Sequence, residues 1–97
     1  MKGSYVGKPA GAKLLRLDLE WNDGLVVRVS IRGDFFAHPE DGFDEAEAAL
    51  AGVPVAELGA VLERELEVRG VTLFGLSPGD VGAAASGIVA SIDGVSA

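Results

Sequence analysis

The chain has 97 residues, of which 48% are hydrophobic and 24% charged, and this composition is typical of a folded globular domain. It has no cysteine, which excludes disulfides, thiolate metal sites and cysteine nucleophiles, and its net charge of −7 argues against nucleic-acid binding. The sequence shows no signal peptide and no apolar run long enough to span a bilayer, so we expect a cytoplasmic protein without membrane contact.

Charge is divided unevenly along the chain. Residues 1–33 carry six basic and three acidic side chains, whereas residues 34–97 carry two basic and twelve acidic ones. Two interpretations stay open. In the first, the acidic half is a helical layer with solvated faces. In the second, the basic half meets an anion or an acidic partner.

Strands are predicted in the first third of the chain. Apolar and polar residues alternate over about residues 14–22 and again over about 25–32, which is the period of strands with one buried face. Asn22-Asp23-Gly24 separates the two runs as a turn, so we expect a β-hairpin. A third strand is predicted near residues 2–6.

The register of this hairpin follows from matching apolar faces across the strand pair. A two-residue loop would place Leu19 opposite Arg28 and so mix buried with exposed side chains. A three-residue loop, with Gly24 in the left-handed region as a bulge, instead places Leu19 opposite Val27. We therefore expect the three-residue loop, with Asp18 opposite Arg28 on the other face.

About three helices are predicted after the hairpin. Apolar residues recur at helical spacing over 41–50 and over about 54–69, with Gly52 and Gly70 as breaks. The run 71–74 is either a short strand or a packed connection. Ser77-Pro78-Gly79-Asp80 is typical of a helix start, and the helix is expected to continue to about residue 92.

These elements predict an α+β fold, in which a small antiparallel sheet built on the hairpin packs against the helices. We expect a single domain over residues 1–97, with a frayed tail at about 93–97.

The chain offers little catalytic chemistry of its own. His38 is the only histidine, and we expect it to be a solvated loop residue. Gly33 and Asp34 end the second strand and are expected to form a structural turn, as Gly24 does in the hairpin. A general-base role for Asp34, or a hydrolase that uses His38 with Asp34, is disfavoured. We predict neither a catalytic residue nor a metal site.

Contacts with other molecules are predicted at two places. Lys8 and Lys13 flank the segment Pro9-Ala10-Gly11 and are candidates for binding a phosphate or carboxylate that a partner supplies. Phe35 and Phe36 point to opposite sides of an extended chain. One ring is therefore expected in the core, and the other at a partner interface.

The sequence resembles the C-terminal accessory domain of lipoate–protein ligases, which in some archaea and bacteria is a separate small subunit. The segments that carry the resemblance are Lys2-Gly3-Ser4-Tyr5 with Gly11-Ala12-Lys13-Leu14, then Ile31-Arg32-Gly33-Asp34-Phe35-Phe36 with Pro39-Glu40, and finally Val71 with Ser77-Pro78-Gly79-Asp80. The Gly-Asp-Phe-Phe segment is the most specific of them. Pro9-Ala10-Gly11-Ala12-Lys13 departs from the Pro-Gly-Gly-Lys-like loop of the family by an extra residue and by Ala12 in place of a glycine.

The resemblance implies a non-catalytic subunit that docks on a separate catalytic subunit in a heterodimer. In this family the catalytic domain binds ATP, Mg²⁺ and lipoate, forms lipoyl-adenylate and transfers lipoate to a lysine of acyl-carrier proteins. The accessory domain enables adenylation and needs no cofactor of its own. The expected partners are therefore the catalytic subunit and, indirectly, the lipoyl-acceptor proteins. The alternative is an interaction or small-ligand-binding module unrelated to lipoate, such as a homodimer.

Overall fold

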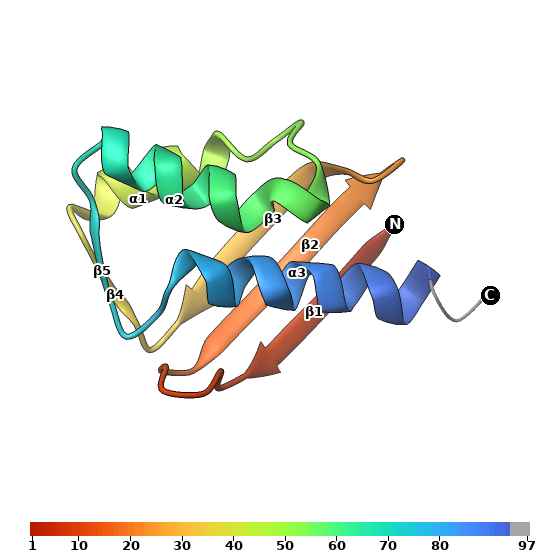
Figure 1. Ribbon diagram of the computed structural model, residues 1–97, viewed down its shortest axis with the longest axis horizontal. Helices are drawn as coiled ribbons and strands as arrows, with labels where there is room; N and C mark the ends of the chain where they lie inside the picture. The colour runs from red at the N-terminus through yellow and green to blue at the C-terminus, as the bar shows by residue number, and fades with distance from the viewer. Residues whose placement is uncertain (94–97) are drawn as a thin grey trace.

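A three-stranded antiparallel sheet forms one layer of the computed structural model, which describes residues 1–93 (Figure 1). The strands are β1 (Lys2–Gly7), β2 (Leu15–Asn22) and β3 (Leu25–Gly33), in the order β1-β2-β3. Along β2 every second side chain is buried, which is what the alternating sequence requires of a strand with one covered face. The predicted hairpin and third strand are confirmed.

The predicted register of the hairpin is wrong, because the loop has two residues. Asp23 and Gly24 both have positive φ, 53° and 76°, as a type I′ hairpin turn requires. A β-bulge then shifts the pairing next to Glu20, and Leu19 lies opposite Val29. The bulge restores the match between apolar faces that the longer loop was expected to provide.

This bulge changes which side chains of β3 face the core. Val26 is buried, while Val27 is 49% exposed. Arg28 lies opposite Glu20, with 3.5 Å between Nη2 and Oε1, and Asp18 lies opposite Ser30 rather than Arg28. The prediction failed because it kept strict alternation through the whole of 25–32.

Helices cover one face of the sheet (Figure 1). They are α1 (Glu40–Ala48), a short 3₁₀ turn η1 (Val55–Glu57), α2 (Leu58–Val68) and α3 (Pro78–Asp93). α3 packs across β1 and β2, whereas α1 packs against β3. The three predicted helices are thus confirmed, and the second opens with the 3₁₀ turn. The α+β fold is confirmed with them.

The start of α3 is fixed by a capping box. The hydroxyl of Ser77 accepts a hydrogen bond from the Asp80 N–H at 3.1 Å, and the Asp80 carboxylate accepts one from the Ser77 N–H at 3.2 Å. This is the arrangement that the sequence predicts. At the other end the helix reaches Asp93. Of the expected frayed tail, residues 94–97 lie outside the described part of the chain.

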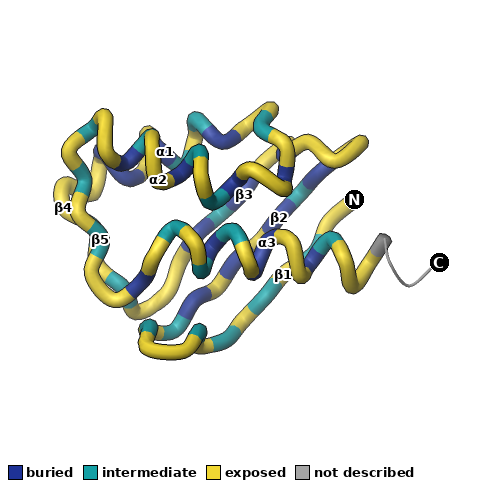
Figure 2. Tube along the Cα trace, viewed as in Figure 1, coloured by how far each residue is buried: buried dark blue, intermediate teal, exposed yellow. Residues whose placement is uncertain are grey.

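The core lies between the sheet and the helices, and Figure 2 shows buried segments in the central strands and in the helices. Its fully buried large side chains come from both layers: Leu15, Leu17, Trp21, Ile31, Leu50, Leu58, Leu62 and Val81. The other face of the sheet stays open to solvent and carries polar side chains, as expected of an antiparallel sheet covered on one side.

A second, smaller sheet lies at one end of the molecule. It is a two-stranded antiparallel ribbon of β4 (Phe36–His38) and β5 (Thr72–Phe74), in which Phe36 lies opposite Phe74. The run 71–74 is therefore a strand for most of its length, which decides between the alternatives left by the sequence. β4 was not predicted. Each strand has three residues, too few to display a periodic pattern.

The outer edge of β3 is covered by other parts of the chain. The Val26 N–H donates to Val53 O at 2.8 Å, and Val26 O accepts from the Gly52 N–H at 2.7 Å. Further along, the Glu47 carboxylate of α1 accepts the Ile31 N–H at 2.7 Å. The same oxygen lies 3.0 Å from Nη1 of Arg32. These contacts satisfy strand groups that would otherwise lack partners.

α2 and α3 approach each other most closely at two glycines. A Cβ on Gly82 would lie 2.9 Å from the Cα of Gly59 and 3.0 Å from its backbone nitrogen. Neither atom belongs to a side chain that can rotate away. Glycine is needed here because only a residue without a side chain lets the helices come this close.

Alanine substitutions at two glycines of α3 should therefore have opposite effects. Gly82→Ala is expected to lower the free energy of unfolding by about 1–3 kcal/mol, since the methyl group meets the backbone of α2. Gly87 faces open space, so Gly87→Ala should raise it by about 0.5–1 kcal/mol through better helix propensity. Urea unfolding of both variants measures the difference. Changes of the same sign in the free energy of unfolding would contradict the need for glycine at the contact between α2 and α3.

Candidate functional site

Three segments that lie far apart in the sequence meet beside the β4–β5 ribbon. The carbonyl oxygen of Leu14, just before β2, accepts a hydrogen bond from the Asp34 N–H at 3.0 Å. The carbonyl oxygen of Gly75, just after β5, accepts one from the Lys13 N–H at 2.7 Å. These bonds join the loop before β2 to the end of β3 and to the residue that follows the ribbon.

Gly33 makes the first of these junctions possible. Its φ is +152°, and a Cβ at this position would collide with the carbonyl oxygen of Leu14. An L residue would meet both difficulties at once, because this conformation is rare for side chains and the space is filled by backbone. Asp34 contributes its backbone N–H to the junction.

The two phenylalanines after Asp34 lie on opposite sides of the chain. The ring of Phe35 is half-buried and its centroid lies 5.6 Å from that of Phe43 in α1, with the rings tilted by 55°. The ring of Phe36 is 73% exposed. The structure thus divides the pair as the sequence predicts. The partner-interface role assigned to these residues stays a prediction.

Phe74 is a candidate residue that the sequence analysis did not identify. Its side chain is 55% exposed and lies directly opposite Phe36 in the ribbon. The apolar run 71–74 carries no signal of which side chain faces outward. The exposure of Phe74 becomes apparent only when β4 and β5 pair, because pairing puts Phe36 and Phe74 on one face of the ribbon and Leu73 on the other.

A hollow of about 350 Å³ lies next to Phe36, between the end of β3, β4 and α1. Phe35 and Phe43 are among its apolar lining residues. Its polar lining comes from Arg32, Glu40, and Asp44 of α1. The hollow is thus apolar in part, with charged side chains of both signs around it.

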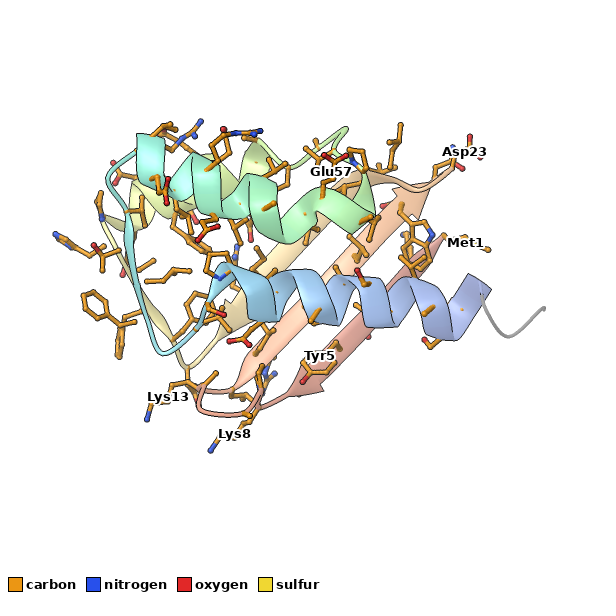
Figure 3. The ribbon with its side chains drawn as sticks, in the orientation of Figure 1. Met1, Tyr5, Lys8, Lys13, Asp23 and Glu57 are labelled. Atoms are coloured by element: carbon orange, nitrogen blue, oxygen red, sulfur yellow. The ribbon has the colours of Figure 1, made fainter. Side chains whose placement is uncertain are left out.

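Lys8 and Lys13 lie at the corner formed by the loop between β1 and β2, and Figure 3 shows both side chains directed away from the body of the molecule. The stem of Lys13 passes over Gly75, so that a Cβ added to Gly75 would lie 2.7 Å from the Cγ of Lys13. Lys13 is therefore a neighbour of the ribbon. The anion contacts of these lysines stay a prediction.

His38 is exposed, as expected, but it lies in β4 opposite Thr72 rather than in a loop. The prediction of a loop position is wrong because β4 is formed only by pairing with a strand distant in sequence. Among residues 1–93 there is no group of three or more His, Asp or Glu side chains arranged to hold a metal ion.

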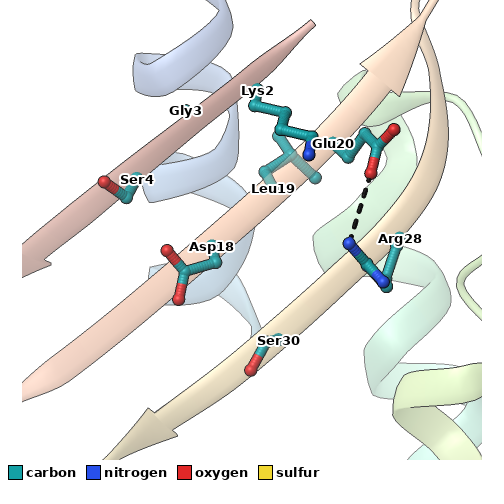
Figure 4. Close-up of a pocket in the computed structure, with 8 residues that line it drawn as sticks. All are labelled: Lys2, Gly3, Ser4, Asp18, Leu19, Glu20, Arg28 and Ser30. Atoms are coloured by element: carbon teal, nitrogen blue, oxygen red, sulfur yellow. Dashed lines mark hydrogen bonds and ion pairs between the residues drawn. The ribbon is translucent and has the colours of Figure 1, made fainter.

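The open face of the main sheet carries a second hollow, of about 270 Å³ (Figure 4). Across the strands, Lys2, Glu20 and Arg28 form one row, and Asp18 lies between Ser4 and Ser30 in the next. Opposite charges alternate in the first row, where an exposed Arg28 pairs with a half-buried Glu20. This face therefore presents mixed charge.

None of the helices formed by residues 1–93 combines the length and hydrophobicity that crossing a bilayer requires.

No protein-family model and no curated protein matches the chain. Among solved structures, the fold is similar to a chain from the archaeal lipoylation system of Thermoplasma acidophilum, described as a bipartite lipoate protein ligase and its E2 lipoyl domain. The TM-score is 0.69 and the sequence identity 27%. The resemblance to a bipartite lipoate–protein ligase is confirmed. It covers 88% of this chain and 97% of the other, so the two chains share the fold over most of their lengths rather than in one motif.

Proposed function

We propose that this chain is the non-catalytic accessory subunit of a lipoate–protein ligase. It docks on a separate catalytic subunit and enables the ATP-dependent activation of lipoate to lipoyl-adenylate. The observation that carries the proposal is the similarity to nearly the whole of a chain from a bipartite ligase system, at 27% identity. The active complex is a cytoplasmic heterodimer, and the lipoyl-acceptor proteins are its indirect partners.

The side chains of this chain fit a supporting role. Its one histidine is exposed on a short strand, and the sequence contains no cysteine. General acid–base or nucleophilic catalysis needs an activated group held by a second one, and the exposed His38 has no such setting. In this proposal ATP, Mg²⁺ and lipoate bind to the catalytic subunit, and this chain contributes a surface.

Docking can promote adenylation by excluding water from the active site of the catalytic subunit and by ordering the groups around the substrates. Formation of lipoyl-adenylate brings a carboxylate to a phosphate, and both carry negative charge. Donors that are already in place around them stabilise the transition state more strongly when water is excluded. The exposed Lys8 and Lys13 are the cations of this chain that we propose for contact with an anion at the subunit boundary.

The test is reconstitution with the candidate catalytic subunit. Lipoate-dependent pyrophosphate release is expected to rise at least about tenfold when this chain is added in equal amount, a change of about 1.4 kcal/mol in the activation barrier. An unrelated acidic protein of similar size serves as the control. Equal rates with and without this chain would contradict the proposal.

A further inference from the structure

The exposed aromatic side chains of residues 1–93 are gathered in one place. Phe36 and Phe74 are 73% and 55% exposed and lie opposite each other in the ribbon. The remaining aromatic side chains are buried or half-buried: Tyr5, Trp21, Phe35 and Phe43. Two aromatic rings left in water on the same face are costly to the isolated chain, and such pairs are typical of interface centres.

The ribbon that carries these rings is held on its other face only. Leu73 and Ala37 face the core and are half-buried, so the outward face adds little to the stability of the fold. A two-stranded ribbon of this length is also too small to be stable alone. The rest of the chain thus holds the ribbon in place, and the ribbon presents the rings of Phe36 and Phe74 to solvent.

The surroundings of the ring pair define what a partner must offer. The hollow next to Phe36 has room for an apolar side chain, and Glu40 and Asp44 on its α1 side favour a basic group nearby. The stem of Lys13 lies against Gly75, the residue after Phe74, and its positive charge favours a carboxylate on the partner. The surface therefore has an aromatic centre, acidic side chains on α1, and basic side chains at Arg32 in the hollow and at Lys13 in the loop.

We propose that this aromatic surface, defined as Phe36, Phe74 and the hollow beside Phe36, is where the catalytic ligase subunit docks. The inference rests on the proposed function and assigns the contact to particular residues. The catalytic subunit would insert an apolar side chain into the hollow and cover both rings.

A second copy of this chain is the less suitable occupant. Each copy carries a net charge of −7, so two copies repel each other, whereas a partner of different sequence can supply the complementary charges. The similarity to a bipartite ligase also calls for a different chain as partner. A standard interface covers about 800 Å² on each side, roughly a seventh of the 5452 Å² of this chain, so the contact extends from the ribbon onto α1 and the Lys13 corner.

The experiment compares Phe36→Ser, Phe74→Ser and the double variant with Val68→Ser. Val68 is 71% exposed on α2, so its substitution removes an apolar side chain of similar exposure elsewhere. Calorimetric titration of the full-length chain into the catalytic subunit gives the Kd. Each single Phe variant should weaken binding about 30-fold, as residues at interface centres do, and Val68→Ser should leave the Kd within about twofold.

The outcomes separate this inference from the proposed function. If the wild-type chain stimulates pyrophosphate release but the Phe variants bind as it does, the docking surface is wrong and the function stands. If the wild-type chain neither binds nor stimulates, both are wrong. Light scattering that shows a homodimer dissociated by Phe36→Ser would assign the surface to a second copy and overturn the inference.

Circular dichroism verifies that each variant folds. Should a serine variant unfold, Phe36→Leu and Phe74→Leu carry the test, because leucine keeps an apolar side chain and removes only the ring. These variants are expected to weaken binding about 3- to 10-fold, and an unchanged Kd would again overturn the inference.

Discussion

Gly33→Ala should lower the free energy of unfolding by about 2–4 kcal/mol. The added methyl group would collide with the Leu14 carbonyl oxygen, which is backbone and part of a hydrogen-bonded junction. Relief of the collision must move Leu14 or the end of β3. Either movement lengthens the 3.0 Å hydrogen bond between Leu14 O and the Asp34 N–H.

Gly52→Ala is the matched control for this substitution. Gly52 also has a positive φ, 86°, but a Cβ there would meet nothing within 4 Å. Its alanine variant should lose only about 1 kcal/mol, the cost of the backbone conformation. Urea unfolding of both variants measures the difference. Equal losses would mean that the close approach of Leu14 to Gly33 contributes nothing.

Leu62→Ala is expected to cost about 3 kcal/mol, within the range measured for buried leucines in other proteins. Leu62 is fully buried in the middle of α2 and belongs to the cluster that joins the helices to the sheet. Its truncation removes apolar contact and leaves a cavity in a packed interior, so two unfavourable terms add.

Val68→Ala in the same helix separates packing from helix propensity. Val68 is 71% exposed, so its truncation should change the free energy of unfolding by no more than about 0.5 kcal/mol. Thermal unfolding followed by circular dichroism compares the two variants. A loss for Leu62→Ala as small as that for Val68→Ala would mean that the site collapses without a cavity.

The sequence predicts the elements whose signals are local. β2 is recognised because its apolar residues alternate without interruption, and α3 because Ser77 and Asp80 form a capping box before an apolar stripe. The hairpin register fails at the bulge, because strict alternation through Val27 is the simplest pattern and the sequence does not mark the extra residue. Local periodicity thus specifies an element and misses an irregularity inside it.

The candidate site is only half visible in the sequence for the same reason. Phe36 could be singled out because it follows a strand and a neighbouring phenylalanine. Phe74 could not, because its exposure depends on pairing between β4 and β5, which lie far apart in the sequence. The contact of Lys13 with Gly75 has the same origin. Features created by long-range pairing require the folded structure.

The two edges of the main sheet differ in what they can accept. Along β3, backbone groups of Val26 and Ile31 are already bonded to the segment 52–53 and to Glu47. Within residues 1–93, no segment pairs with the outer edge of β1. Two copies can therefore associate by pairing their β1 strands, and the resulting pair of main sheets offers no further β1 edge to a third copy. Strand pairing of this sheet leads to closed pairs and not to fibres, because growth in both directions needs two open edges.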